Sequence, residues 1–538
     1  MRQTAEPAVE QALPPVAITL PGLVQWAAQQ FGDQVFLEEE STRISFADFA
    51  VQARQVAKAL LAKNIQKGDR IAIWAPNIHE WVIAALGAQC VGAVLVTLNT
   101  RYKGHEAAYI LRSSHTRLLF SIGAFLGCDY PALLKDESLP ELEEIVLFRD
   151  ERPFQNTDHP RYSHWQAFLE SGTTVSEQAI NARMESITGE DLSDILFTSG
   201  TTGNPKGVMT SHEQNLRTFT AYTDIIGMQA GERYLVINPF FHSFGYKAGI
   251  LACLLKGVTL LPHAVFNAVE ILDRVAKEKI SILPGPPTLF QSILALPDLE
   301  KYDISSLKRA MTGAAVIPVE MIRQMKKRLG FEVVITAYGL TECCGVVSMC
   351  RANDSAELIA TTSGRAISGI EVRCVDPENN EVARGEPGEI VVRGFNVMKG
   401  YFENPTATEE AIDQEGWLHT GDIAVMDDQG YLKITDRLKD MFITGGFNCY
   451  PAEIEKIMAA HPAIAMNAVI GAPDERMGEV AMAFVVLKPN ATLNEGELIA
   501  WCRNEMANFK VPRIIRFVDA LPLNASGKVV KAELKKLI

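Results

Sequence analysis

Cysteines are few in this sequence and are not arranged as a scaffold. Nine are scattered over 538 residues, at positions 90, 128, 253, 343, 344, 350, 374, 449 and 502. They form no CxxC pair and are not spaced with histidines as zinc ligands are. The pattern disfavours a cysteine-based metal module and a disulfide framework, and it favours reduced thiols in a cytoplasmic protein.

Acidic residues also outnumber basic ones: the chain has 51 Lys and Arg and 65 Asp and Glu, which gives a formal net charge of −14. Proteins that bind nucleic acid or anionic membranes gather positive charge, so the balance argues against both as general partners. Residues 1–21 carry glutamates and prolines where a signal peptide would need an apolar core, so secretion is not expected.

Long charge-free runs are scarce, and one window, Trp81 to Leu98, requires a membrane test. It could be a membrane span, or a buried helix followed by a buried strand. Residues up to about Val91 suit a helix, and after Gly92 the β-branched run AVLVTL has the length of a strand. We interpret the window as helix then strand and expect no stable membrane insertion.

Hydrophobic residues make up 47% of the chain, enough for a large globular core. From about residue 44 to 340, helix-like stretches alternate with strand-like runs: RIAIWAP (70–76), AVLVTL (93–98), GVTLLP (257–262) and ISILPGPP (280–287). This alternation predicts an α/β architecture with mainly parallel sheets. Short alternating runs from about 365 to 436 predict antiparallel strands, and later residues have the pattern of a small separate domain.

The stretch LFTSGTTGNPKG (196–207) combines three glycines, four hydroxyl side chains and a lysine. It fails the Walker spacing, because Pro205 precedes Lys206, Gly207 follows it, and no Ser or Thr stands next to bind magnesium. Its glycines, hydroxyls and cation still suit a polyphosphate. A polar surface turn is the alternative at this point.

Further motifs follow in a fixed order: YGLTE (338–342), GWLHTGD (416–422), DRLKD (436–440), GGFNCYPAEIE (445–455) and LPLNASGKVVK (521–531). With LFTSGTTGNPKGVMTSH and NTRYKGHEAAYIL (99–111), they resemble the signature of the adenylate-forming superfamily of acyl-CoA synthetases, aryl-CoA ligases, luciferases and peptide-synthetase adenylation domains. The resemblance covers nearly the whole chain. It implies doubly wound parallel sheets plus a β-barrel-like subdomain in an N-terminal domain (1–436), a hinge (437–439), and a small mobile α+β C-terminal domain (440–538).

The resemblance also implies ATP, Mg²⁺ and coenzyme A as reactants or cofactors. A carboxylate would attack the α-phosphate of ATP, and a thiol would then displace AMP from the acyl-adenylate. The residues expected to bind ATP or AMP are Thr198, Ser199, Gly200, Thr201, Thr202, Gly203, Lys206, Gly313, Ala314, Ala315, Tyr338, Gly339, Thr341, Asp422, Arg437 and Lys528.

Four of the implied residues are expected to be catalytic: Lys528, His242, Thr202 and Glu342. Glu342 is also the expected magnesium ligand, because a carboxylate oxygen suits a hard cation. Lys528 would bridge the substrate carboxylate and the α-phosphate, so its acetylation by a lysine acetyltransferase would switch adenylation off. His242, among phenylalanines, would otherwise be read as a core residue.

One site must exclude water during adenylation and later admit a thiol. In this family the C-terminal domain rotates, which implies a hinge at Lys439 and a CoA tunnel walled by Gly445 and Gly446. Lys247 has no family-wide assignment; a solvated side chain is the default expectation, and contact with a polar group of the substrate is the alternative.

The acceptor is expected to be free coenzyme A, since no carrier domain follows the last motif; a carrier protein or a luciferin-type reaction is the alternative. The acyl pocket is expected to include Phe241, Phe244, Gly245, Tyr246, Lys247, Gly285, Cys343 and Gly345. Their mixture of aromatic and small residues suggests a medium-chain, alicyclic or aryl acid. The strip FFHSFGYKAG, with LPGPPTLFQSIL (283–294), is most similar to actinobacterial ligases that activate a steroid-derived hydrindane propanoate. A long-chain fatty acid, a non-enzymatic relative and a homodimer also remain open.

Overall fold

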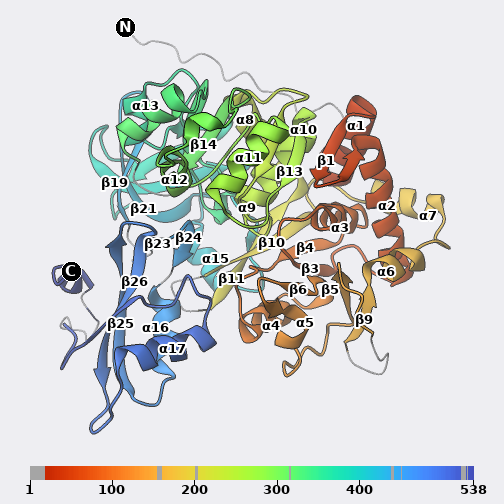
Figure 1. Ribbon diagram of the computed structural model, residues 1–538. Coiled ribbons are helices and arrows are strands. Elements are labelled where there is room, and N and C mark those ends of the chain that lie inside the picture. Colours follow the sequence, from red (N-terminus) through yellow and green to blue (C-terminus); the bar gives the residue numbers. More distant parts are fainter. Residues whose placement is uncertain are drawn as a thin grey trace.

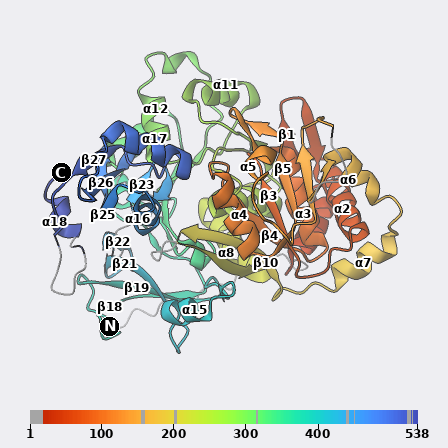
Figure 2. The ribbon, with the colours of Figure 1, turned by 90° about the horizontal axis from the view of Figure 1, so that it is seen from below.

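The computed structural model describes residues 18–153, 160–199, 204–313, 317–437, 442–449, 451–522, 529 and 531–538. A large body of helices packed on sheets carries a smaller C-terminal unit at its side (Figure 1). The second view, from below, shows the same two parts next to each other (Figure 2). The predicted division at 436 to 440 stays a prediction, because residues 438–441 lie outside the described part.

One sheet of the large body has the strand order β2-β1-β13-β12 and continues through Ile282 into β14-β15-β16-β17. Its strands are β1 (Val35–Glu39), β2 (Thr42–Ser45), β12 (Arg233–Val236), β13 (Thr259–Pro262), β14 (Arg309–Gly313), β15 (Val333–Tyr338), β16 (Ser348–Met349) and β17 (Arg365–Ala366). The strand expected over 280–287 is reduced to isolated bridges at Ile282. The three prolines of this segment lack the N–H that a strand ladder requires, so the prediction was too long.

The second sheet has the order β20-β11-β10-β4-β3-β5-β8-β9 and is parallel from β10 to β9. Its strands are β3 (Arg70–Trp74), β4 (Val94–Thr97), β5 (Thr116–Ile122), β8 (Glu144–Phe148), β9 (Arg161–His164), β10 (Leu192–Ser199), β11 (Pro205–Ser211) and β20 (Gly400–Tyr401). A small hairpin pairs β6 (Ala124–Phe125) with β7 (Cys128–Asp129). The predicted parallel α/β sheets are confirmed.

Helices separate and cover these sheets (Figures 1 and 2). They are α1 (Leu20–Phe31), α2 (Phe46–Ala62), α3 (His79–Cys90), α4 (Gly104–Ser113), α5 (Tyr130–Leu133), α6 (Trp165–Ser171), α7 (Glu177–Glu185), α8 (His212–Ile226), α9 (Ser243–Gly245), α10 (Ala252–Lys256), α11 (Ala268–Glu278), α12 (Pro287–Leu294), α13 (Val319–Arg328) and α14 (Ala356–Thr361). The window Trp81–Leu98 is α3 followed by β4, both buried, as expected. Among the described residues, no helix is both long enough and apolar enough to cross a bilayer.

The predicted antiparallel region is a four-stranded sheet, β18 (Ile370–Val375), β19 (Pro387–Gly394), β21 (Leu418–Met426) and β22 (Leu432–Arg437), with α15 (Pro405–Ala411) beside it. All of its strand pairs are antiparallel. Buried Ile390, Val392, Leu418 and Leu432 form its core. This half-barrel confirms the expected subdomain.

The C-terminal unit has its own sheet, β24-β23-β26-β25, with β27 parallel to β26. Its elements are β23 (Phe442–Thr444), β24 (Phe447–Cys449), α16 (Pro451–Ala459), β25 (Ile464–Asp474), β26 (Gly478–Leu487), α17 (Glu495–Glu505), β27 (Ile514–Phe517) and α18 (Lys531–Lys535). A separate hydrophobic cluster that includes Ile454, Val469 and Leu498 fills its interior. The expected small α+β domain is therefore confirmed as a fold.

Candidate functional site

The glycine-rich stretch is the tip of a hairpin between β10 and β11. Thr198 stands directly opposite Lys206, so a hydroxyl and a lysine side chain lie on the same face of the sheet at the base of the tip. Lys206 Nζ lies 4.9 Å from the centre of the Tyr401 ring on β20, a cation–π contact that holds the lysine at the sheet edge. The tip residues Gly200, Thr201, Thr202 and Gly203, and the side chain of Ser199, lie outside the described residues.

Glu342 meets this hairpin from another sheet. It belongs to the 3₁₀ turn η3 (Thr341–Cys343), just after β15. Its Oε1 accepts a hydrogen bond from Tyr401 Oη at 2.9 Å and a long one from Thr198 Oγ1 at 3.4 Å. The fold thus brings Thr198, Lys206 and Glu342 close together. It adds Tyr401, which the sequence reasoning missed, because no motif spacing connects residue 401 to residue 342.

A second carboxylate lies at the junction of β15 and the half-barrel. Tyr338 Oη donates a 2.7 Å hydrogen bond to Asp422 Oδ2. Burial, together with the negative charge of Asp422, holds the pKa of Tyr338 well above its usual value, so the phenol remains a donor. Asp422 on β21 pairs in register with Arg437 on β22. Two carboxylates, a phenol and the hairpin therefore converge from three sheets.

The glycines of this site have a steric role. A Cβ on Gly339 would lie 2.1 Å from the carbonyl oxygen of Gly345, so this close crossing requires glycine. Gly313 ends β14 beside β15, and Ala314 and Ala315 after it lie outside the described residues. The expected nucleotide residues Gly313, Tyr338, Gly339 and Thr341 thus lie at the ends of two adjacent strands.

The expected acyl wall follows β12. His242 caps α9, and its Nδ1 accepts a 3.2 Å hydrogen bond from the Phe244 amide. His242 has an exposed surface, yet many protein atoms surround its imidazole and displace water from it. This partial loss of solvation lowers the pKa of His242 to about 4. His242 is therefore neutral at pH 7. A Cβ on Gly245 would lie 2.1 Å from the Pro239 carbonyl oxygen, so the turn requires glycine there.

The remaining acyl-wall residues differ in exposure. Phe241 and Phe244 are half-buried, whereas Tyr246 and Cys343 are fully buried. Tyr246 Oη accepts a 2.6 Å hydrogen bond from Gln89, and that contact belongs to the protein interior. A Cβ on Gly345 would lie 3.2 Å from Ser243 Oγ, and one on Gly285 would lie 2.2 Å from the Leu289 side chain.

The side chain of Lys247 is not solvated, so the default expectation for this residue was wrong. It is fully buried on the π-helical segment η1 (Tyr246–Leu251). Its Nζ lies 2.8 Å from Asp194 Oδ1 and 2.9 Å from Thr210 Oγ1. Ser193 and Asn215 donate to the other oxygen of Asp194, each at 2.6 Å. The π-helical turn directs the lysine at the base of the hairpin, so it links the expected acyl wall to the two strands that carry the glycine-rich tip.

Several expected residues cannot be compared with the structure. Lys439 and Lys528, and the side chain of Arg437, lie outside the described residues. Gly445 and Gly446 are described; they form the turn between β23 and β24 with φ of +55° and +86°, which glycine adopts easily. All nine cysteines are unpaired, and eight of them are buried, in agreement with reduced thiols.

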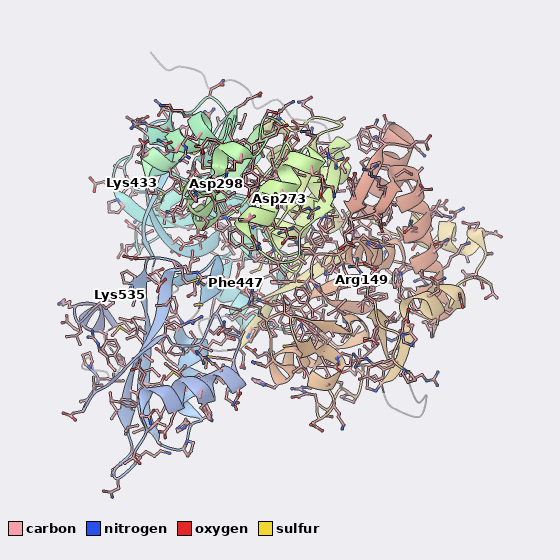
Figure 3. All side chains as sticks on the ribbon, in the orientation of Figure 1. Arg149, Asp273, Asp298, Lys433, Phe447 and Lys535 are labelled. Atoms are coloured by element: carbon pink, nitrogen blue, oxygen red, sulfur yellow. The ribbon has the colours of Figure 1, made fainter. Side chains whose placement is uncertain are left out.

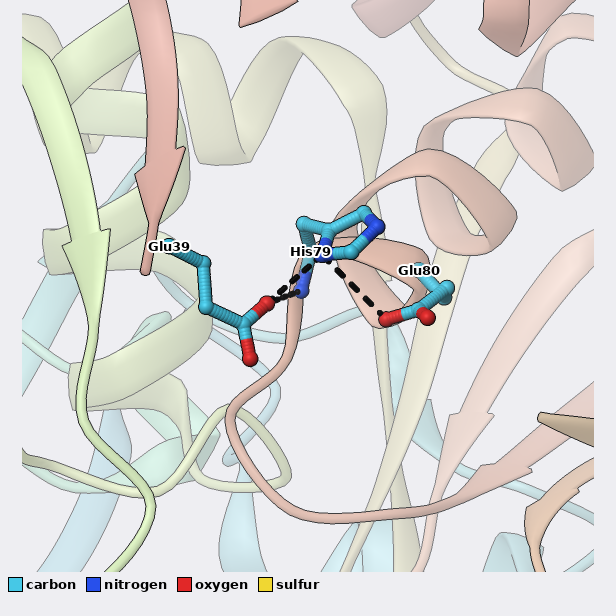
Figure 4. Close-up of side chains that lie close together, drawn as sticks. All are labelled: Glu39, His79 and Glu80. Carbon is cyan, nitrogen blue, oxygen red and sulfur yellow. Dashed lines mark hydrogen bonds and ion pairs between the residues drawn. The ribbon is translucent and has the colours of Figure 1, made fainter. Parts of the chain in front are cut away.

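Three further side chains of the metal-ligating type form a separate cluster, which Figure 4 shows in close-up. Glu39, His79 and Glu80 are close enough to hold a cation. Arg149, however, donates to both carboxylates at 2.7 to 2.9 Å. Its guanidinium already supplies the positive charge between the two glutamates, so the cluster is a partly buried ion-pair network.

Comparison with known proteins agrees with this geometry. The AMP-binding enzyme family matches residues 24–402, and the AMP-binding enzyme C-terminal domain matches residues 453–528. The chain is similar to two 3-[(3aS,4S,7aS)-7a-methyl-1,5-dioxo-octahydro-1H-inden-4-yl]propanoyl:CoA ligases. The Rhodococcus jostii protein is 46% identical (96% of this chain, 98% of the relative), and the Mycobacterium tuberculosis protein is 44% identical (96% and 99%).

Among solved structures, the chain resembles o-succinylbenzoate CoA synthetase from Bacillus subtilis at 26% identity. A double mutant of that enzyme bound with the product analogue OSB-NCoA superposes with a TM-score of 0.78 (96% of this chain, 98% of that chain). The complex of that enzyme with AMP gives 0.63 (95% and 98%). From its motifs, its fold and these matches, the chain belongs to the AMP-binding enzyme family, within the acyl-CoA ligases of the adenylate-forming superfamily.

Proposed function

We propose that the protein converts a carboxylic acid to its coenzyme A thioester in two steps. A carboxylate oxygen attacks the α-phosphorus of ATP and pyrophosphate leaves; the thiolate sulfur of coenzyme A then attacks the acyl carbon and AMP leaves. The observation that carries the proposal is the convergence of Glu342, Thr198 and Lys206 with Tyr338 and Asp422. Together they offer a cation, donors and carboxylates to one nucleotide.

Each group has a role that its surroundings suit. Lys206 and the hydroxyls of the hairpin, Thr202 included, would hold the β- and γ-phosphates, and Asp422 would accept from the ribose hydroxyls. In the described part of the chain, the side-chain hydrogen bonds of Glu342 fall on Oε1, so Oε2 faces no competing donor there. A hard oxygen next to the phosphate loop fits Mg²⁺, which would neutralise the charge of the leaving pyrophosphate.

Neutral His242 would orient the substrate carboxylate as a hydrogen-bond donor through Nε2, since its Nδ1 is occupied by the Phe244 amide. Lys528 would join carboxylate and α-phosphate during the first step. For the second step, the C-terminal domain would turn about Lys439 and bring Gly445 and Gly446 to the thiol path. The TM-score is higher with the complex that holds the product analogue OSB-NCoA than with the AMP complex, which favours an arrangement like that of the product complex here. Acetylation of Lys528, a homodimer and a cytoplasmic location stay predictions.

For the acid, we propose a fused bicyclic ring system that carries a propanoate arm, of the steroid-derived type. The similarity of 46% and 44% to two ligases named for such a propanoate supports this class over linear acids. The half-buried Phe241 and Phe244 offer apolar faces to a rigid ring. Medium-chain or aryl acids, long-chain fatty acids and loading of a carrier protein are the alternatives.

A substrate panel tests this proposal. Purified protein with ATP, Mg²⁺ and coenzyme A is given bicyclic ring propanoates, aryl acids, and linear acids of increasing length, and AMP and thioester are measured together. The ring propanoate should give the highest kcat/KM. Preference for every linear acid over every ring acid would refute the substrate class, and AMP release without thioester would refute coenzyme A as the acceptor.

A further inference from the structure

One lysine of the C-terminal unit joins the two parts of the molecule. Lys510, between α17 and β27, places Nζ 2.8 Å from Glu106 Oε1 on α4 of the large body and 2.7 Å from Glu453 Oε1 on α16. The side chains of Lys510, Glu106 and Glu453 have only 2%, 9% and 7% of their area exposed, so Lys510 and Glu453 are buried and Glu106 is nearly so. An ammonium shared by carboxylates from both parts is thus enclosed at their junction.

Aromatic rings complete this enclosure. The Tyr102 ring of the large body lies 4.8 Å from Lys510 Nζ, and the Phe509 ring lies 5.6 Å away. Phe447 stacks on Phe509 with ring centres 4.6 Å apart, and Arg101 lies over Phe447 at 5.8 Å. Tyr102 also packs against the C-terminal hydrophobic cluster. Figure 3 labels Phe447, which lies where the two parts meet.

The contact depends on one relative position of the two parts. Glu453 moves with Lys510, so that ion pair survives a rotation of the C-terminal unit, whereas Glu106 and Tyr102 stay with the large body. Although burial opposes the charge, Glu453 and Glu106 raise the pKa of Lys510, so it remains a cation at any working pH. An enclosed ion pair adds little net stability, because desolvation offsets the attraction, but a buried charge that loses a partner is costly. The pair is therefore suited to selecting between arrangements.

We propose that Lys510 and Glu106 are positioning residues that hold the C-terminal domain in the thioester-forming arrangement. This inference rests on the proposed function, because it assigns the contact to the second of its two steps. The turn with Gly445 and Gly446, which would wall the thiol path, leads directly into Phe447, which stacks on Phe509 next to Lys510. Holding Lys510 in place therefore holds that turn against the large body.

The variant Glu106→Gln tests the proposal without unfolding α4. Glu106 also closes a capping box, in which its Oε2 accepts a 2.9 Å hydrogen bond from the Lys103 amide, and glutamine serves equally well at that position. The change therefore removes charge but keeps the cap. Glu497→Gln is the matched control, since Glu497 closes the capping box of α17 and makes no ion pair among the described residues.

Both half-reactions are measured on full-length protein, as ATP–pyrophosphate exchange and as thioester formation from preformed acyl-adenylate. Glu106→Gln should slow thioester formation at least about tenfold, the effect of losing a hydrogen bond to a charged group, and should leave exchange unchanged or faster. Tyr102→Leu should act in the same direction, and Glu497→Gln should change neither step. Equal loss in both steps, or no loss in either, would overturn the proposal.

A distance measurement separates this inference from the proposed function. Cys128 is the exposed cysteine on β7, and Ala500→Cys would place a second label on the exposed face of α17. Spin labels at these two positions should report a narrower distance distribution in the parent protein than with Glu106→Gln. Identical distributions would overturn the positioning role even if the wild type proved inactive on every acid of the panel.

Discussion

The buried ion pair between Lys247 and Asp194 allows a quantitative prediction. Both side chains are 0% exposed, and their charged atoms are 2.8 Å apart. Lys247→Met removes the ammonium at nearly constant volume and leaves a carboxylate in the interior. Removal of one partner of a buried pair costs about 3–5 kcal/mol. Ser193, Thr210 and Asn215 still donate to Asp194, so we expect the lower end of that range, about 3 kcal/mol.

Urea unfolding followed by tryptophan fluorescence measures this change, because Trp74 and Trp81 are fully buried in the large body. The exposed pair Lys279–Asp303 provides a matched control, since 58% and 54% of those side chains are exposed. Lys279→Met should cost less than about 1 kcal/mol. The double variant Lys247→Met/Asp194→Asn should lose less stability than the two single variants together, by at least about 1.5 kcal/mol.

Two results would refute this reasoning. If Lys247→Met lowered the free energy of unfolding by less than about 1 kcal/mol, the buried ammonium would contribute no more to stability than a surface charge does. Additive single effects in the double variant would mean that the two groups do not interact in the folded state.

Three other perturbations have defined outcomes. Tyr338→Phe removes a hydrogen bond to Asp422 worth about 1.5 kcal/mol or more. The KM for ATP should therefore rise about tenfold, while the KM for the acid stays constant. An equal rise in both KM values would contradict a nucleotide-binding role for Tyr338. Lys528→Ala should abolish adenylate formation but preserve thioester formation from preformed acyl-adenylate. An equal loss of both activities would refute the assignment of Lys528 to the first step alone. Burial raises the pKa of Glu39, but hydrogen bonds from His79 and Arg149 outweigh this effect and lower the pKa to about 2 from an ordinary 4.5. This carboxylate therefore stabilises the folded state above pH 4.5, and the stabilisation is lost as the pH falls toward 2. Glu39→Gln should flatten the acid limb of stability in that window, and an unchanged limb would show that the carboxylate contributes nothing.

Local pattern alone determined most of the architecture. The alternation of strand-like and helix-like runs predicted the parallel sheets, and the switch at Gly92 correctly divided α3 from β4. The antiparallel strands of the half-barrel followed from short alternating runs between turn residues, whereas its barrel-like form was implied by the family resemblance. These features depend on side-chain period and turn chemistry, which are properties of neighbouring residues. The error at 280–287 has the same local origin, because the prolines were weighed less than the apolar run.

The site was predictable in its composition but not in its contacts. The motifs named Thr198, Lys206, Tyr338, Glu342 and Asp422, and the fold brings them together from three sheets. The partners that complete the geometry carry no sequence signal: Tyr401 for Glu342, and Asp194 for Lys247. Lys510 and Glu106 are 404 positions apart. Periodicity specifies the face of an element on which a side chain stands, but only the packing of whole sheets and domains decides which distant side chain it meets.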